Sequence, residues 1–290
     1  MKKVVAWFLV LLLGGVLPVT AQSVNGELDH RDDFEMESMS GGDFRSYVSE
    51  HIPEDDQWAY SMRTLGNMHN FMHELMTEIA HHGAEERADS ALVPAINRRI
   101  SGGEWTTLRK NLEETGEASA WRNLVQITEI MHDRVHHAMT KAVTYDHKTR
   151  SRDVELAPFV REMALPADVA IPNRNALHLN HISQDDFRML GWTETYMPAR
   201  WHASMQNMVV FNHLLYDLLT QWGAYGAEHE NPACQPPESM SPMTNDGWAR
   251  YAQTVEACDD ATWRELVQIA DLMKDRIHHM MYKMVEYGEE

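Results

Sequence analysis

The sequence predicts an all-α protein built as an internally duplicated helical bundle. Residues 121–145 recur as residues 263–287, with 15 of 25 positions identical. In both segments apolar residues follow one another at intervals of three and four, which is the spacing of a helix packed in a bundle. No comparable stretch alternates apolar and polar residues as a strand does.

Each copy contains the same order of predicted helices. A long helix covers about 57–82 in the first copy and 198–224 in the second. A shorter helix covers about 103–114 and 245–256 and carries Trp105 or Trp248. A helix of about 30 residues then begins near 117 and near 260, and we interpret the repeated tryptophans as packing residues.

A hairpin of two long helices buries only one apolar stripe, so two hairpins are expected to close one pseudo-two-fold four-helix bundle. The alternative is two separate small bundles. The predicted repeats cover 43–148 and 185–290, with a proline-containing connector over 149–184 and an acidic, disordered leader over 22–42.

The first 21 residues have the layout of a secretory signal peptide. Lys2 and Lys3 precede an uncharged run from Val4 to Val16, and Val19-Thr20-Ala21 resembles a cleavage site. The protein is therefore expected to be periplasmic or secreted, without a membrane span. The two cysteines, Cys234 and Cys258, would form a disulfide bond in such an oxidising compartment, and two free buried thiols are the alternative.

The charge balance limits the partners. The chain carries a net charge of −19, and loss of Lys2 and Lys3 with the signal would take this to about −21. Such a field disfavours nucleic acid and anionic lipid. It leaves metal cations, a protein partner or a second copy of the chain. The 20 methionines are weak evidence for copper because methionine also fills cores.

Histidine pairs recur in the duplicated segment as His136-His137 and His278-His279. Adjacent helical residues point about 100° apart, so a metal would need further ligands at i±4 or on another helix. In the first copy His132 lies four residues before His136, a spacing that lets two imidazoles share an ion. Lys274 replaces it in the second copy, so that pair occurs once.

The preceding long helix offers His69 and His73 at the same spacing. Only His73 recurs, as His213, while Val209 stands at the position that matches His69. The candidate metal ligands are thus His136, His137, His278, His279, His73, His213, His132 and His69. Imidazole with methionine sulfur favours copper, whereas imidazole with carboxylate suits zinc or iron.

Other interpretations of the histidines remain open. The dyads could be structural, with Asp133 or Asp275 as a hydrogen-bond partner, or could bind haem or another ligand. Two Glu-x-x-His steps, Glu78 to His81 and Glu129 to His132, resemble half of a di-iron site, but the second copy lacks them. His81-His82, and His178 and His181 in the connector, are expected to be solvated.

No catalytic motif is present, so no catalytic residue is assigned. The sequence therefore predicts an exported helical protein that binds a transition metal, with copper favoured, for sequestration or delivery. The alternative is a metal-free helical module that recognises a protein partner or small ligand through grooves lined by methionine and tryptophan.

Overall fold

The computed structural model describes residues 39–87, 99–114, 120–149, 187, 199–229, 245–255 and 261–288. Within these residues the chain forms seven helices and no strand, which confirms the all-α prediction. The helices are α2 (Gly41–His51), α3 (Gln57–Arg87), α4 (Gly102–Glu114), α5 (Ala120–Thr149), α8 (Ala199–His229), α9 (Asn245–Val255) and α10 (Ala261–Gly288). The signal peptide, Cys234, Cys258, His178 and His181 lie outside the described residues.

Six of these helices match the predicted ones, but α2 was not anticipated. Gly41 and Gly42, which we assigned to the end of a disordered leader, are its first two residues. The side chain of Ser40 caps the helix by accepting a hydrogen bond from the Asp43 N–H. The helix ends at Ile52, whose extended backbone suits a residue that precedes proline.

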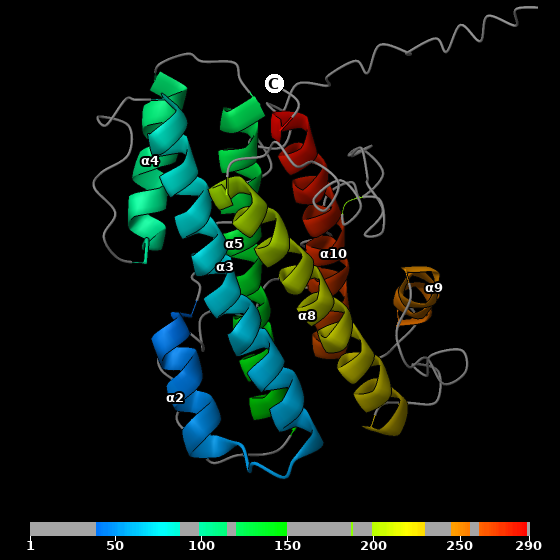
Figure 1. Cartoon of the computed structure of the whole chain (residues 1–290). Coiled ribbons are helices and arrows are strands. Elements are labelled where there is room, and N and C mark those ends of the chain that lie inside the picture. Colours follow the sequence, from blue (N-terminus) through cyan, green and yellow to red (C-terminus); the bar gives the residue numbers. More distant parts are fainter. Residues whose placement is uncertain are drawn as a thin grey trace, which may run out of the picture.

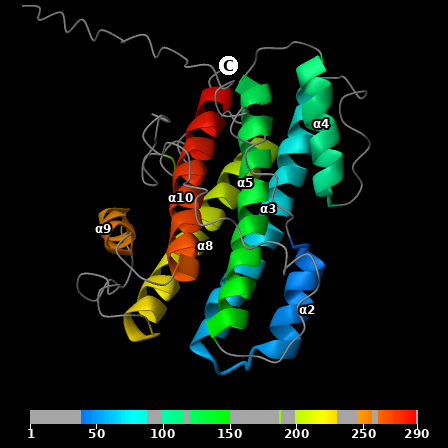
Figure 2. The ribbon, with the colours of Figure 1, turned by 180° about the vertical axis from the view of Figure 1, so that it is seen from behind.

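The four long helices pack side by side, and their closest partners come from opposite halves of the chain. Helix α3 packs along α8, and α5 packs along α10, while α3 also contacts α5 and α10 contacts α8. The same arrangement is visible from both sides of the molecule in Figures 1 and 2. Through these contacts, residues from both halves of the chain enter one apolar cluster.

An aromatic cluster lies at each end of this four-helix core, with a ring contributed by each long helix. One cluster contains Trp58, Tyr145, Trp222, Tyr225 and Trp263, and the other contains His82, Trp121, Trp201 and Tyr287. Every tryptophan among the described residues is buried, as predicted for packing residues. We expected His82 to be solvated, and this was wrong, because its ring packs 5.0 Å from that of Trp201.

Between the aromatic clusters, methionine supplies much of the core. Buried methionines occur on each long helix, among them Met72, Met131, Met208 and Met280. They pack with leucine, isoleucine and valine in one continuous apolar cluster. None of the described helices has a stretch apolar enough to cross a membrane.

The two short helices α2 and α4 lie on the same side of the molecule. Helix α2 packs on α3 and α5, and α4 packs on α5. Figure 1 shows that they run in opposite directions away from the middle of the long helices, so their first turns lie near each other there. This position places both helix beginnings beside the histidines described next.

Candidate metal centre

Two histidines of α3 and two of α5 meet in the interior of the protein. The ring of His69 lies 4.8 Å from that of His136, and the ring of His73 lies 5.1 Å from that of His132. One nitrogen each from His69, His73 and His136 lie within 4.8 Å of one another. The Nε2 atoms of His132 and His136 are 3.1 Å apart. We call His69, His73, His132 and His136 the imidazole tetrad.

Backbone carbonyl groups fix the tautomers of two tetrad members. His136 Nδ1 lies 2.8 Å from the Met39 carbonyl oxygen, and His73 Nδ1 lies 3.0 Å from that of Ile100. A carbonyl can only accept, so each Nδ1 must donate and each Nε2 keeps a lone pair. Donation from one ring nitrogen to an outer partner is the usual arrangement of a metal-binding histidine.

The contact between His132 and His136 depends on where His132 carries its hydrogen. His132 Nδ1 lies 3.3 Å from the Asp133 carboxylate, which favours the neutral form with its hydrogen on Nδ1. The two Nε2 lone pairs would then face each other at 3.1 Å and repel, unless a shared metal ion or an added proton lies between them. In the other neutral form, His132 Nε2 donates a hydrogen bond to His136 Nε2.

His69 is the fourth member, and among the described residues its Nδ1 atom differs from those of the other three rings. Its side chain is 7% exposed, and its Nδ1 atom has no hydrogen bond among the described residues. A buried ring nitrogen without a partner costs free energy, which a bound metal or its outer ligand would offset. The missing partner therefore agrees with a ligand role.

Burial favours the neutral form of three of these histidines, His69, His73 and His136. Burial, with a further contribution from the neighbouring His136, lowers the pKa of His69 to about 3. Burial likewise lowers the pKa of His73 and of His136 to about 4, even though their hydrogen bonds to backbone carbonyls oppose that change. Neutral imidazole is the form that binds metal, so these rings need lose no proton near neutral pH.

Two similar segments surround the tetrad, and we call them the capping segments. They are residues 39–44, with the sequence MSGGDF, and residues 100–105, with the sequence ISGGEW. Each opens a short helix through its serine: Ser40 accepts from the Asp43 N–H at 3.1 Å, and Ser101 accepts from the Glu104 N–H at 3.3 Å. Their first residues, Met39 and Ile100, supply the two carbonyl oxygens that fix the histidines.

The same two first residues also bind the long helices through their N–H groups. Met39 donates to Thr140 Oγ1 and Ile100 donates to Thr77 Oγ1, both at 3.0 Å. Each threonine lies four residues after the histidine whose Nδ1 is fixed, so the two polar groups lie on the same helix face. Both long helices thus carry the pattern His-x3-His-x3-Thr.

The first glycine of each capping segment lies against the remaining two rings. A Cβ atom on Gly41 would lie 2.2 Å from His69 Cε1, and one on Gly102 would lie 3.0 Å from His132 Cε1. At Gly41 such a contact requires a glycine, whereas at Gly102 a Cβ atom would require the His132 ring to move by a few tenths of an ångström. By contrast, a Cβ atom on Gly103 would meet nothing within 4 Å.

The second half of the chain lacks this constellation. The positions that match the tetrad hold Val209, His213, Lys274 and His278. His213 is exposed, Lys274 lies 3.3 Å from the Asp271 carboxylate, and His278 Nε2 lies 3.1 Å from the Tyr216 hydroxyl. The positions that match Gly41, Gly102, Thr77 and Thr140 hold Gln184, Asn245, Asp217 and Tyr282.

Four predicted ligands therefore lie in the tetrad, and four do not. His213 and His278 have the surroundings just described. His137 and His279 are buried, but neither belongs to the group of close ring nitrogens formed by His69, His73 and His136. Burial, with Arg134 and Lys141 nearby, lowers the pKa of His137 well below its usual range.

The carboxylate of the Glu-x-x-His step is engaged elsewhere. Glu129 accepts a hydrogen bond from Thr106 Oγ1 at 2.9 Å and forms an ion pair with Arg109. Both of these partners of the Glu129 carboxylate belong to α4. The tetrad alone offers four nitrogen donors, whose chemistry is coordination of a transition metal.

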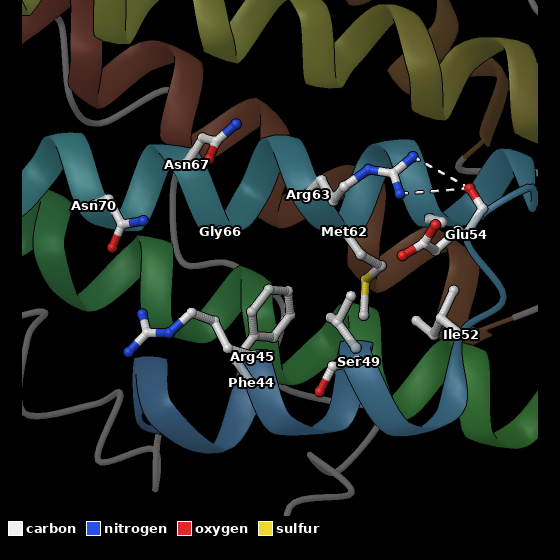
Figure 3. A pocket seen from close by; sticks show the side chains of 12 residues that line it. Phe44, Arg45, Ser49, Ile52, Glu54, Met62, Arg63, Gly66, Asn67 and Asn70 are labelled. Atoms are coloured by element: carbon white, nitrogen blue, oxygen red, sulfur yellow. Dashed lines mark hydrogen bonds between the residues drawn. The ribbon is translucent and has the colours of Figure 1, made fainter.

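A separate groove lies between α2 and α3. It has a volume of about 390 Å³, with Phe44, Ile52 and Met62 among its apolar lining residues. Arg45 and Arg63 project from the two helices at different points along it, as Figure 3 shows. The groove could hold a small ligand, although Arg63 already donates to the Glu54 carbonyl oxygen.

No family model, curated relative or solved structure matches this chain. The assignment of the site therefore rests on its geometry. The sequence contained one signal that we missed, namely the recurrence of Ser-Gly-Gly followed by an acidic and an aromatic residue at 40–44 and 101–105.

Proposed function

We propose that this protein binds one transition-metal ion at the imidazole tetrad and serves in metal sequestration or delivery after export. The observation that carries the proposal is the contact between His132 and His136. Their Nε2 atoms lie 3.1 Å apart while their Nδ1 atoms face a carboxylate and a carbonyl oxygen. Copper is favoured because imidazole nitrogens bind it most tightly among first-row divalent metals, and zinc or iron are the alternatives.

The internal comparison between the two halves supports this proposal. Six positions of this constellation differ in the second half. They are two of the tetrad histidines, both glycines that contact a ring, and both threonines. A purely structural role for the capping segments would not need imidazoles and glycines to change as a group. Their joint presence in one half is expected if they serve one site.

We further propose that the chain arose by duplication and that its four long helices form one bundle. The support is the sequence repeat, together with the packing of α3 on α8 and of α5 on α10. In this bundle one half retains the metal centre. The other half completes the core that keeps α3 and α5 in register.

Alanine variants of matched histidines test the proposed function. His73→Ala with His136→Ala should reduce the affinity for Cu(II) or Zn(II) at least 100-fold, because two of four nitrogen donors are lost. The matched control is His213→Ala with His278→Ala, at the corresponding positions of the second half, which should retain full affinity. Titration calorimetry on untagged protein measures both, and circular dichroism checks the fold.

Equal affinity of the two double variants would contradict the proposal. A lower denaturant midpoint for His73→Ala with His136→Ala, without a loss of metal affinity, would assign these histidines a structural role. Metal content and stability must therefore be measured on the same samples.

The alternative function, a metal-free ligand-binding module, has one supporting feature. The groove between α2 and α3 has a size suited to a small molecule and contains Met62, as a methionine-lined groove would. It contains no tryptophan, unlike the grooves expected from the sequence. The tetrad has more specific chemistry, so metal binding remains the first proposal.

A further inference from the structure

The four tetrad rings have a flattened arrangement. Around the tetrad, adjacent ring centroids are 4.7, 5.1, 4.4 and 4.8 Å apart, in the order His69, His73, His132 and His136. Across it, His73 and His136 are 6.4 Å apart. Four ligands in a tetrahedron would be equally spaced, whereas a square plane makes the diagonal about 1.4 times the side. The long diagonal therefore excludes a regular tetrahedron of ring centres and agrees with a flattened set.

The size of this set matches one bound ion. With a metal–nitrogen distance of about 2.0 Å and a ring centre about 1.1 Å beyond the nitrogen, opposite centroids should be roughly 6.2 Å apart. The observed separation of His73 and His136 is 6.4 Å. Adjacent nitrogens in such a plane should be about 2.8 Å apart, and those of His132 and His136 are 3.1 Å apart.

The contacts around the tetrad hold this shape without a metal. The diagonal pair His73 and His136 is held by the carbonyl oxygens of Ile100 and Met39. The other two rings, His69 and His132, lie against Gly41 and Gly102. Rearrangement toward a tetrahedron would break a hydrogen bond or force a ring into the backbone.

We propose that, if the tetrad binds metal as argued above, it selects Cu(II) in a plane of four imidazole nitrogens over Zn(II) and Cu(I). Cu(II) favours square-planar or tetragonal nitrogen ligation, whereas Zn(II) favours a tetrahedron. Cu(I) is a softer ion that thiolate and thioether ligands favour, and none of the four donors is sulfur. The inference thus rests on the proposed function and narrows its metal and oxidation state.

Electron paramagnetic resonance of the full chain with one equivalent of copper sulfate tests this inference. The expected spectrum is axial, with nitrogen superhyperfine splitting from four equivalent nitrogens. His69→Ala should reduce the count to three nitrogens, whereas His213→Ala, a change at an exposed position, should leave four. A 100-fold excess of zinc sulfate should displace less than half of the copper, and ascorbate should increase copper release to a Cu(I) chelator at least 10-fold.

Several results would overturn the inference. A rhombic spectrum with the small parallel splitting of distorted tetrahedral copper would refute the planar set. Displacement of copper by equimolar zinc, or tighter retention after reduction, would refute the selectivity. In each of these cases the metal-binding function would stand. Failure to bind copper, zinc or iron, or equal metal binding by the His73→Ala and His136→Ala double variant, would instead remove both the inference and the proposed function.

Discussion

At the scale of single residues, the contrast between His136 and His137 shows how the helix separates adjacent side chains. His136 lies in the tetrad with its Nδ1 bonded to the Met39 carbonyl. His137 points about 100° away, into a buried region with Arg134 and Lys141 nearby. Recurrence in the sequence could not separate the two, because both imidazoles recur in the second half.

The two glycines of the second capping segment, Gly102 and Gly103, allow a matched test of whether the close approach of the backbone to His132 matters for metal binding. Gly102→Ala places a Cβ atom 3.0 Å from His132 Cε1, so this ring must shift. We expect metal affinity to fall about 10- to 100-fold, as for loss of an outer-shell partner. Gly103→Ala adds the same methyl group in open space and should leave affinity unchanged within about twofold. Equal effects of the two changes would show that ring position is not controlled by Gly102.

The lowered pKa values of three tetrad histidines also predict how stability without metal depends on pH. The pKa values of His69, His73 and His136 lie near 3, 4 and 4, below the usual value of 6.5. The unfolded chain therefore binds more protons, and stability is complete above pH 6.5 and declines as pH falls toward 4. Each histidine contributes a slope of up to about 1.4 kcal/mol per pH unit in this window.

Urea denaturation at a series of pH values measures this slope. The comparison of the parent with His73→Ala and His136→Ala isolates the tetrad contribution, since the double variant should show a shallower decline between pH 6.5 and 4. A parallel decline in the two proteins would show that other groups cause the acid sensitivity.

At the scale of helices, the capping segments connect the position of α2 and α4 to the metal centre. Met39, which lies just before α2, forms hydrogen bonds with Thr140 and His136 of α5. Within α2, Tyr47 donates a hydrogen bond to Asp146 at 2.8 Å. The long helices were predictable because their apolar spacing is local. Helix α2 was not, because the Thr140 and His136 groups that hold its capping segment lie about 100 positions away in sequence.

Metal binding should therefore protect α2 from hydrogen exchange. If α2 detaches more easily without metal, saturation at about 100 times the dissociation constant stabilises the docked form by about 2.7 kcal/mol. Amide exchange in α2 should slow by up to about 100-fold on addition of copper. Helix α9 packs on α10 and α8 and serves as the internal control, with unchanged exchange. Equal protection of α2 and α9 would indicate global stabilisation instead.

At the scale of the whole molecule, the two halves share a core but differ at the site. Recurrence predicted the helices, and their contacts across the two halves are present. Recurrence alone could not predict which histidines come together, because it favoured His213, His278 and His279, which lie outside the tetrad. The tetrad depends on His69 and His132, which do not recur, and on i,i+4 pairs that face each other only after α3 and α5 pack.

A fragment of residues 39–150 contains the complete tetrad and both capping segments, and it tests whether this half can fold alone. In the full chain α8 packs along α3 and α10 packs along α5, so the fragment would expose the apolar faces of α3 and α5 that these helices cover. We expect it to be unfolded or dimeric without metal, since burial of these faces drives association. Sedimentation velocity and thermal melting measure this, with the full chain as control. A monomeric fragment that melts cooperatively would instead show that each half is an independent bundle.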